Sequence, residues 1–164
     1  INKHRRGLRF MVSSERPGGN APRGVEGINC PTFESRPWVE GPPLNRRRMA
    51  IISMAGLHQP QDRPFTRDSG DYYRIIPGNV KASDLVMSHI SVNFDRSGFQ
   101  QDWNVVFPID RLREFAREGV IGSVADFHYS FMGADDPLKW EQQGRFLAGL
   151  LKKDKVDAVL LIPI

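Results

Sequence analysis

The chain has 164 residues, of which 40% are apolar and 26% are charged, as is typical of a folded globular protein. No apolar run reaches the roughly 18 residues of a membrane-spanning helix, and no apolar stretch of a signal peptide follows the basic start. The single cysteine, Cys30, excludes an internal disulfide and a thiolate metal site, so the sequence predicts a cytoplasmic protein.

Residues 1–48 are predicted to form a basic tail rich in Pro and Gly. They carry ten Lys and Arg residues against four Glu, a net charge of +6, whereas residues 49–164 have a net charge of −2. Such a tail can bind nucleic acid or an anionic membrane, but its composition favours a solvated, disordered leader. Cys30 lies here without a nearby base and is interpreted as an incidental thiol. A first residue of Ile rather than Met indicates a fragment or an upstream extension.

The segment after the tail is predicted to contain short strands separated by polar loops. The apolar run MAIISMAG, closed by a glycine, is typical of a buried strand, and YYRIIPG ends in a Pro-Gly turn. In chain order we expect a strand at 49–56, a loop at 57–71, an extended piece at 72–78, a strand or a helical turn leading into a strand at 83–92, a loop at 93–104 and a strand or the end of one at 104–108.

The clearest helix is predicted over residues 108–119. Pro108 suits the first helical position, Asp110 suits the first turn, and Gly119 is the expected stop. One apolar face is formed by Ile109, Leu112, Phe115 and Ala116.

Strand, helix and strand alternate along the rest of the chain. After the helix at 108–119, a strand is predicted at 120–133, a second helix at 135–155 and a final strand at 156–164. This alternation is typical of an α/β fold with a mostly parallel sheet and flanking helices. The sequence therefore predicts a Rossmann-like, three-layer domain that is incomplete at its C-terminus.

Three histidines fall at or near the ends of predicted strands, where open α/β sheets bind ligands. They are His58, His89 and His128, and Asp95 follows shortly after His89. The histidines are candidate catalytic residues because imidazole transfers protons near neutral pH, and Asp95 is a candidate substrate-binding residue. The alternative is that each histidine is a structural residue with satisfied hydrogen bonds. No HxH or HxxxH spacing supports a metal site, and Asp110 is interpreted as a helix-start residue.

The pieces SHISVNFD, FPIDRLREFAREG and HYSFMG, together with VDAVLLIPI, resemble the selenoprotein B family of glycine, sarcosine, betaine and D-proline reductases, and the D-proline branch is closest in size and spacing. The resemblance covers about residues 49–164, the N-terminal part of such a reductase domain. It implies a selenium- or thiol-dependent reductase subunit that cleaves a C–N bond of an amine or amino-acid-like substrate. It also implies a partner subunit with a pyruvoyl group and a thiol-based electron donor, with no cofactor in this chain.

In that family, the strand similar to DAVLLIPI leads into a selenocysteine or cysteine. The resemblance places this redox residue directly after Ile164, and selenocysteine is encoded by UGA, which is also a stop codon. We therefore expect that the chain was ended at this codon and that it is inactive alone. The final strand would expose an unpaired edge, which favours homo-oligomerisation, and His58, His89 and His128 would cluster near its carboxyl end.

Two other functions stay open at this stage. One is a non-catalytic α/β domain that binds a small molecule or another protein. The other is nucleic-acid binding through the basic tail, which the near-neutral charge of residues 49–164 disfavours.

Overall fold

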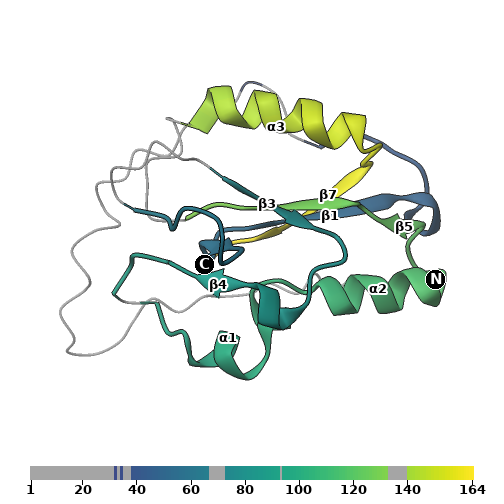
Figure 1. The fold of residues 1–164 in the computed structure, drawn as a ribbon. Coiled ribbons are helices and arrows are strands. Elements are labelled where there is room, and N and C mark those ends of the chain that lie inside the picture. The colour runs from purple at the N-terminus through teal and green to yellow at the C-terminus, as the bar shows by residue number, and fades with distance from the viewer. Residues whose placement is uncertain (1–31, 33, 35–37, 67–72, 93, 133–139) are drawn as a thin grey trace, which may run out of the picture. The chain divides into compact units, whose positions relative to one another are not determined.

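The computed structural model describes residues 32, 34, 38–66, 73–92, 94–132 and 140–164 (Figure 1). The chain divides into two units between Arg36 and Pro37, and all helices and strands of the described residues lie in the second unit. In chain order they are η1 (Leu44–Arg46), β1 (Arg48–Ser53), β2 (Leu57–His58), β3 (Arg74–Pro77), η2 (Ala82–Asp84), β4 (Val86–Met87), α1 (Ser97–Gln101), η3 (Trp103–Val105), α2 (Ile109–Arg117), β5 (Ser123–Val124), β6 (Phe127–Ser130), α3 (Glu141–Lys153) and β7 (Ala158–Ile162). Most of the predicted disordered leader, including Cys30, lies outside the described residues, whereas the end of that segment forms η1 and the start of β1.

Strand β1 is the centre of the main sheet. It pairs in parallel with β7 over five positions, from Met49 opposite Ala158 to Ser53 opposite Ile162. Its other edge pairs in parallel first with β5 and then with β6. Strand β3 joins β6 in antiparallel orientation, and β2 and β4 form a separate antiparallel pair.

The predicted α/β class is confirmed, but the finer arrangement is not. The main sheet is mixed because β3 runs against β6, and three of its strands, β3, β5 and β6, have only two or four residues. Few helices accompany it. A mostly parallel, Rossmann-like three-layer fold is therefore not established.

The two faces of the sheet are covered by different helices, α2 on one face and α3 on the other (Figure 1). Successive residues of a strand point to opposite faces, so Ile51 packs in the core cluster that contains Ile109 and Leu112 of α2. Ile52 packs in the second cluster, around Leu147 of α3. Helix α3, which precedes β7 in the chain, therefore covers the face of the sheet on which Ile52 lies. No helix among the described residues is both long and apolar enough to cross a membrane.

Helix α2 agrees with its prediction at both ends. Ile109 and Leu112 are buried, and Asp110 in the first turn accepts a hydrogen bond from the Trp103 indole nitrogen at 2.8 Å. Gly119 has a φ of 73°, the left-handed conformation that ends many helices. Phe115, expected on the apolar face, is instead 44% exposed.

The strand predicted at 104–108 is wrong, because its start forms the 3-10 helix η3. The carboxylate of Asp102 accepts the backbone N–H of Asn104 at 2.9 Å, which caps this turn. The predicted loop before it contains the short helix α1. A local side-chain hydrogen bond thus overrides the strand preference of the two valines that follow Asn104.

The long strand predicted at 120–133 is broken into β5 and β6. Between them, the backbone N–H of Gly78 donates to the Asp126 carbonyl at 2.7 Å, and the Asp154 carboxylate accepts the N–H of Asp126 at 2.9 Å. These two contacts take the backbone of Asp126 out of the ladder with β1. Paired segments that are distant in the sequence therefore set this break.

We expect Gly78→Ala to lower the free energy of unfolding by about 1–3 kcal/mol, as overpacking does. A Cβ at Gly78 would lie 2.6 Å from the Ala125 carbonyl oxygen, and backbone on both sides cannot yield easily. Urea unfolding measures the effect. Gly149→Ala in α3 is the control, because its Cβ would meet nothing within 4 Å and alanine favours the helix. Equal destabilisation by both changes would contradict the prediction.

Candidate functional site

The chain turns sharply just beyond the carboxyl end of β1. Gly56 has a φ of 67°, and its N–H donates to the Phe131 carbonyl at 2.8 Å. A Cβ on Gly56 would lie 3.1 Å from the backbone nitrogen of His89. The left-handed glycine thus allows the segment of His89 to pass against the segment that leads to His58.

His58, in β2, is 3% exposed and lies edge-on to the Phe65 ring at 6.4 Å. Its Nδ1 is 2.7 Å from the carbonyl oxygen of Gln59. Because a carbonyl oxygen only accepts, Nδ1 carries the hydrogen and Nε2 carries the lone pair. Nε2 is buried and has no hydrogen-bond partner among the described residues.

His89 follows β4 and is 5% exposed. Its Nδ1 accepts the N–H of Ser91 at 3.2 Å, so its Nε2 carries the hydrogen, and that atom has no partner in the described part of the chain. Burial and the nearby Arg96 guanidinium, which also donates to the His89 carbonyl, lower the pKa of His89. The ring is therefore neutral at pH 7 and offers a hydrogen-bond donor.

His128 lies within β6 and is fully buried. Its Nδ1 accepts the N–H of Ile51 at 2.9 Å, and the ring meets Phe107 edge-on at 5.6 Å. Burial, together with the positive charges of Arg113 and Arg48, lowers the pKa of His128 to about 4. The structure thus places His128 in the core beside the middle of β1, whereas His58 and His89 lie beyond the end of that strand.

Asp95 lies on the exposed loop that follows His89. Its Oδ1 accepts the N–H of Ser97 at 2.8 Å at the start of α1, and this hydrogen bond lowers the pKa of Asp95. The geometry gives Asp95 a helix-start contact. Within the described residues, no group of three His, Cys, Asp or Glu side chains could hold a metal ion.

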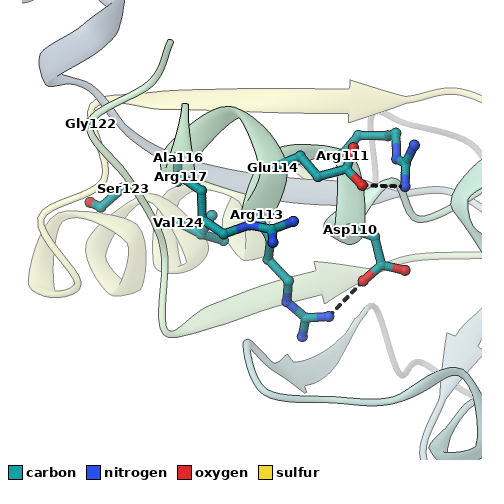
Figure 2. A pocket seen from close by; sticks show the side chains of 9 residues that line it. All are labelled: Asp110, Arg111, Arg113, Glu114, Ala116, Arg117, Gly122, Ser123 and Val124. Carbon is teal, nitrogen blue, oxygen red and sulfur yellow. Dashed lines mark hydrogen bonds and ion pairs between the residues drawn. The ribbon is translucent and has the colours of Figure 1, made fainter. Parts of the chain in front are cut away.

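A groove of about 760 Å³ runs along α2 and β5 (Figure 2). Arg111 pairs with Glu114 at 2.7 Å and Arg113 pairs with Asp110 at 2.8 Å, as the dashed lines of Figure 2 show. The groove includes Ser123, which is opposite the first residue of β1. It therefore lies at the amino ends of the parallel strands, away from His58 and His89.

A smaller apolar pocket lies between α3 and the carboxyl ends of β1 and β6. Its volume is about 260 Å³, and its lining includes Ile52, Phe131 and Trp140. The rings of Phe131 and Trp140 are 5.3 Å apart. This pocket lies on the face of the sheet that α3 covers, whereas Leu57 and Phe94, beside the two histidines, pack in the cluster on the α2 face. Both places are near the carboxyl end of β1, the usual binding edge of α/β sheets.

Sequence reasoning did not find Gln59 and Asp62, which fix the orientation of His58. The N–H of Gln59 donates to the Asp62 carboxylate at 2.9 Å. The signal was present in the stretch HQPQD, where a proline and an aspartate are typical of a turn that bonds its own backbone.

Comparison with known proteins relates this sequence to one family. The family described as glycine/sarcosine/betaine reductase selenoprotein B matches residues 44–163. The chain belongs to this family. The match includes His58, His89 and His128, and it confirms the prediction made from the sequence.

Several curated proteins resemble the chain. D-proline reductase subunit gamma of Acetoanaerobium sticklandii is 38% identical over 121 residues, which are 72% of this chain and 49% of the relative. Glycine reductase complex component B subunit gamma of Symbiobacterium thermophilum is 30% identical over 141 residues, 80% of this chain and 32% of the relative. Betaine reductase complex component B subunit beta of Peptoclostridium acidaminophilum is 27% identical over 123 residues, 72% of this chain and 28% of the relative.

The chain spans about half the length of the D-proline reductase subunit and about a third or less of the other two relatives. All three are named as subunits of reductases, and two are named as parts of reductase complexes. No solved structure matches the chain.

Proposed function

We propose that the protein to which this chain belongs is a reductase subunit that cleaves a C–N bond of a small amine or amino acid, with a selenol or thiol as nucleophile. The observation that carries the proposal is the family match over residues 44–163, together with 38% identity to a named D-proline reductase subunit. The ionised selenolate or thiolate is the nucleophile that such chemistry requires; a selenol is ionised at neutral pH, and a thiol becomes so where its surroundings lower its pKa.

The described residues contribute the part of the site that binds the amine. His58 and His89 lie beyond the carboxyl end of β1, and each has a buried Nε2 that has no partner in the described residues, an acceptor on His58 and a donor on His89. Buried polar atoms normally have partners. Nε2 of His128 also lacks one among the described residues, but that ring lies in the core beside β1, so a bound ligand is proposed as the partner of His58 and His89 only. We propose that His128 supports the sheet beneath the site and that Asp95 holds the loop of His89.

We also propose which partners the protein has and where its redox residue lies. A pyruvoyl-bearing subunit and a thiol-based donor would complete the reaction, as the family resemblance implies. The outer edge of β7 has no strand partner among the described residues, and Leu161 on β7 is 66% exposed, which supports association with another strand or another copy. We propose that the selenocysteine or cysteine is encoded directly after Ile164. A codon for any other residue at that position would contradict this placement of the redox residue.

The reductase assay uses the full-length protein with its partner subunits and a dithiol donor. D-proline, glycine, sarcosine and betaine are offered separately, and formation of the C–N cleavage product is measured. Turnover of at least one substrate is expected. Binding without turnover in the complete complex would contradict the proposal and favour the non-catalytic alternative.

In that assay we expect His58→Gln and His89→Gln each to lower kcat/KM by about tenfold or more. Each change misplaces one hydrogen-bonding nitrogen, and a hydrogen bond to a charged group contributes about 1.5–3 kcal/mol. Arg145→Gln is the matched control, because Arg145 lies on the exposed face of α3 in a pair with Glu141 at 2.7 Å. If kcat/KM is unchanged in both histidine variants, His58 and His89 do not belong to the substrate-binding site.

A further inference from the structure

The three buried imidazoles differ in what they offer to a ligand. We infer that Nε2 of His58 accepts a hydrogen bond from an N–H group of the bound amine, and that Asp62 is the positioning residue that keeps this nitrogen free of hydrogen. The inference rests on the proposed function for the class of ligand. The assignment of the hydrogen on His58 stands on the structure alone.

Opposite tautomers follow from the neighbours of the three rings. Nδ1 of His58 faces the carbonyl oxygen of Gln59, which only accepts, so the hydrogen must lie on Nδ1. Nδ1 of His89 accepts the N–H of Ser91, and Nδ1 of His128 accepts the N–H of Ile51, so both of these rings carry the hydrogen on Nε2. Among these three, only His58 presents a free acceptor.

The carbonyl that fixes His58 is itself held by a tight turn over residues 59–62. The N–H of Asp62 donates to the Gln59 carbonyl at 3.0 Å, and the N–H of Gln59 donates to the Asp62 carboxylate at 2.9 Å. Pro60 occupies the second position of the turn, where its fixed φ favours this geometry. The Asp62 carboxylate thus closes a ring of contacts that holds the Gln59 carbonyl against His58.

The chemistry of the free nitrogen selects the ligand. A buried acceptor without a partner is unfavourable, and a ligand with an N–H or an ammonium group supplies the missing donor. Glycine, sarcosine and D-proline each have hydrogen on nitrogen, whereas the trimethylammonium group of betaine has none. His58 therefore discriminates between amines that bear an N–H and quaternary amines.

Nuclear magnetic resonance of the full-length protein with ¹⁵N-labelled histidine tests the tautomers. The described histidines should give one ring with hydrogen on Nδ1 and two with hydrogen on Nε2. The His58→Gln variant should remove the first of these signals. Hydrogen on Nε2 of His58 would overturn the inference.

Titration with D-proline, glycine, sarcosine and betaine on the same sample tests the ligand. An N–H-bearing amine should move the Nε2 signal of His58 upfield, toward a hydrogen-bonded or protonated nitrogen, and betaine should not. If none of the amines moves the signal, a water molecule is the partner and the ligand assignment is overturned. Turnover in the reductase assay is a separate readout, so failure of that assay with the tautomers intact would remove the proposed function and leave the assignment of His58 standing.

Substitution of Asp62 tests the positioning role. Asp62→Ala should raise the fraction of His58 with hydrogen on Nε2, because the N–H of Gln59 loses its acceptor and the turn that holds the Gln59 carbonyl against His58 loosens. Asp62→Asn should preserve the original tautomer, because an amide oxygen still accepts the N–H of Gln59. Identical tautomers in the Ala and Asn variants would overturn the role of Asp62.

Discussion

Asp154→Ala is expected to lower the free energy of unfolding by about 3 kcal/mol, the effect of breaking a largely buried charged pair. The Asp154 carboxylate lies 2.6 Å from Nη2 of Arg48, and the side chains are 12% and 22% exposed. Its second oxygen accepts the backbone N–H groups of Asp126 and Phe127 at 2.9 and 3.2 Å. The substitution leaves a guanidinium and two N–H groups without their main acceptor, and urea unfolding measures the loss.

The neighbouring carboxylate provides the control for this prediction. Asp126 also contacts Nη2 of Arg48, at 3.1 Å, but its side chain is 76% exposed. Exposed ion pairs contribute little, so Asp126→Ala should cost less than about 1 kcal/mol. Equal losses for the two variants would contradict the assignment of Asp154 as the residue that joins the end of α3 to the starts of β1 and β6.

Lowering the pH from 7 to 5 is expected to reduce the free energy of unfolding by about 2 kcal/mol through His128 alone. Burial, with Arg113 and Arg48, lowers the pKa of His128 to about 4 in the folded protein, against 6.5 for an ordinary histidine. The unfolded chain then binds the proton more readily, so the stability contributed above pH 6.5 is lost as the pH falls toward 4. Urea unfolding at a series of pH values measures this slope.

A matched variant separates His128 from the other titrating groups. In His128→Asn the side-chain oxygen can still accept the N–H of Ile51, but the group no longer titrates. The dependence on pH between 7 and 5 should therefore be about 2 kcal/mol smaller than in the unsubstituted protein. His89, whose pKa is also lowered, titrates in both proteins and cancels in the comparison. The same slope in both proteins would show that His128 is protonated without cost.

The helices and the central strand could be predicted because their signals are local. The apolar spacing of Ile109 and Leu112 and the stop at Gly119 define α2 without any knowledge of the sheet. The same holds for β1, whose apolar run is nearly continuous because helices cover both faces of the sheet. The family, too, followed from short stretches of sequence.

The candidate site could be predicted only in part. The histidines stood out by residue type and by their places near strand ends, but the positions of those ends depended on the break between β5 and β6 and on the turn at Gly56. His128 consequently lies inside β6, whereas His58 and His89 lie past β1. Neither the hydrogen on each ring nor the support from Asp62 follows from spacing, because both depend on which backbone groups face the rings.

The sequence by itself thus determined the α/β class, the helix boundaries of α2 and the selenoprotein B family, since these depend on residue patterns within a few turns or on similarity along the chain. Only the tertiary structure decided the antiparallel edge strand β3, the ion pair between Arg48 and Asp154, and the assignment of His58 Nε2 as the free acceptor among the three buried histidines. Each of these joins residues that are distant in sequence or depends on one hydrogen bond. Such contacts form only when burial removes the competing water and the rest of the chain fixes their geometry.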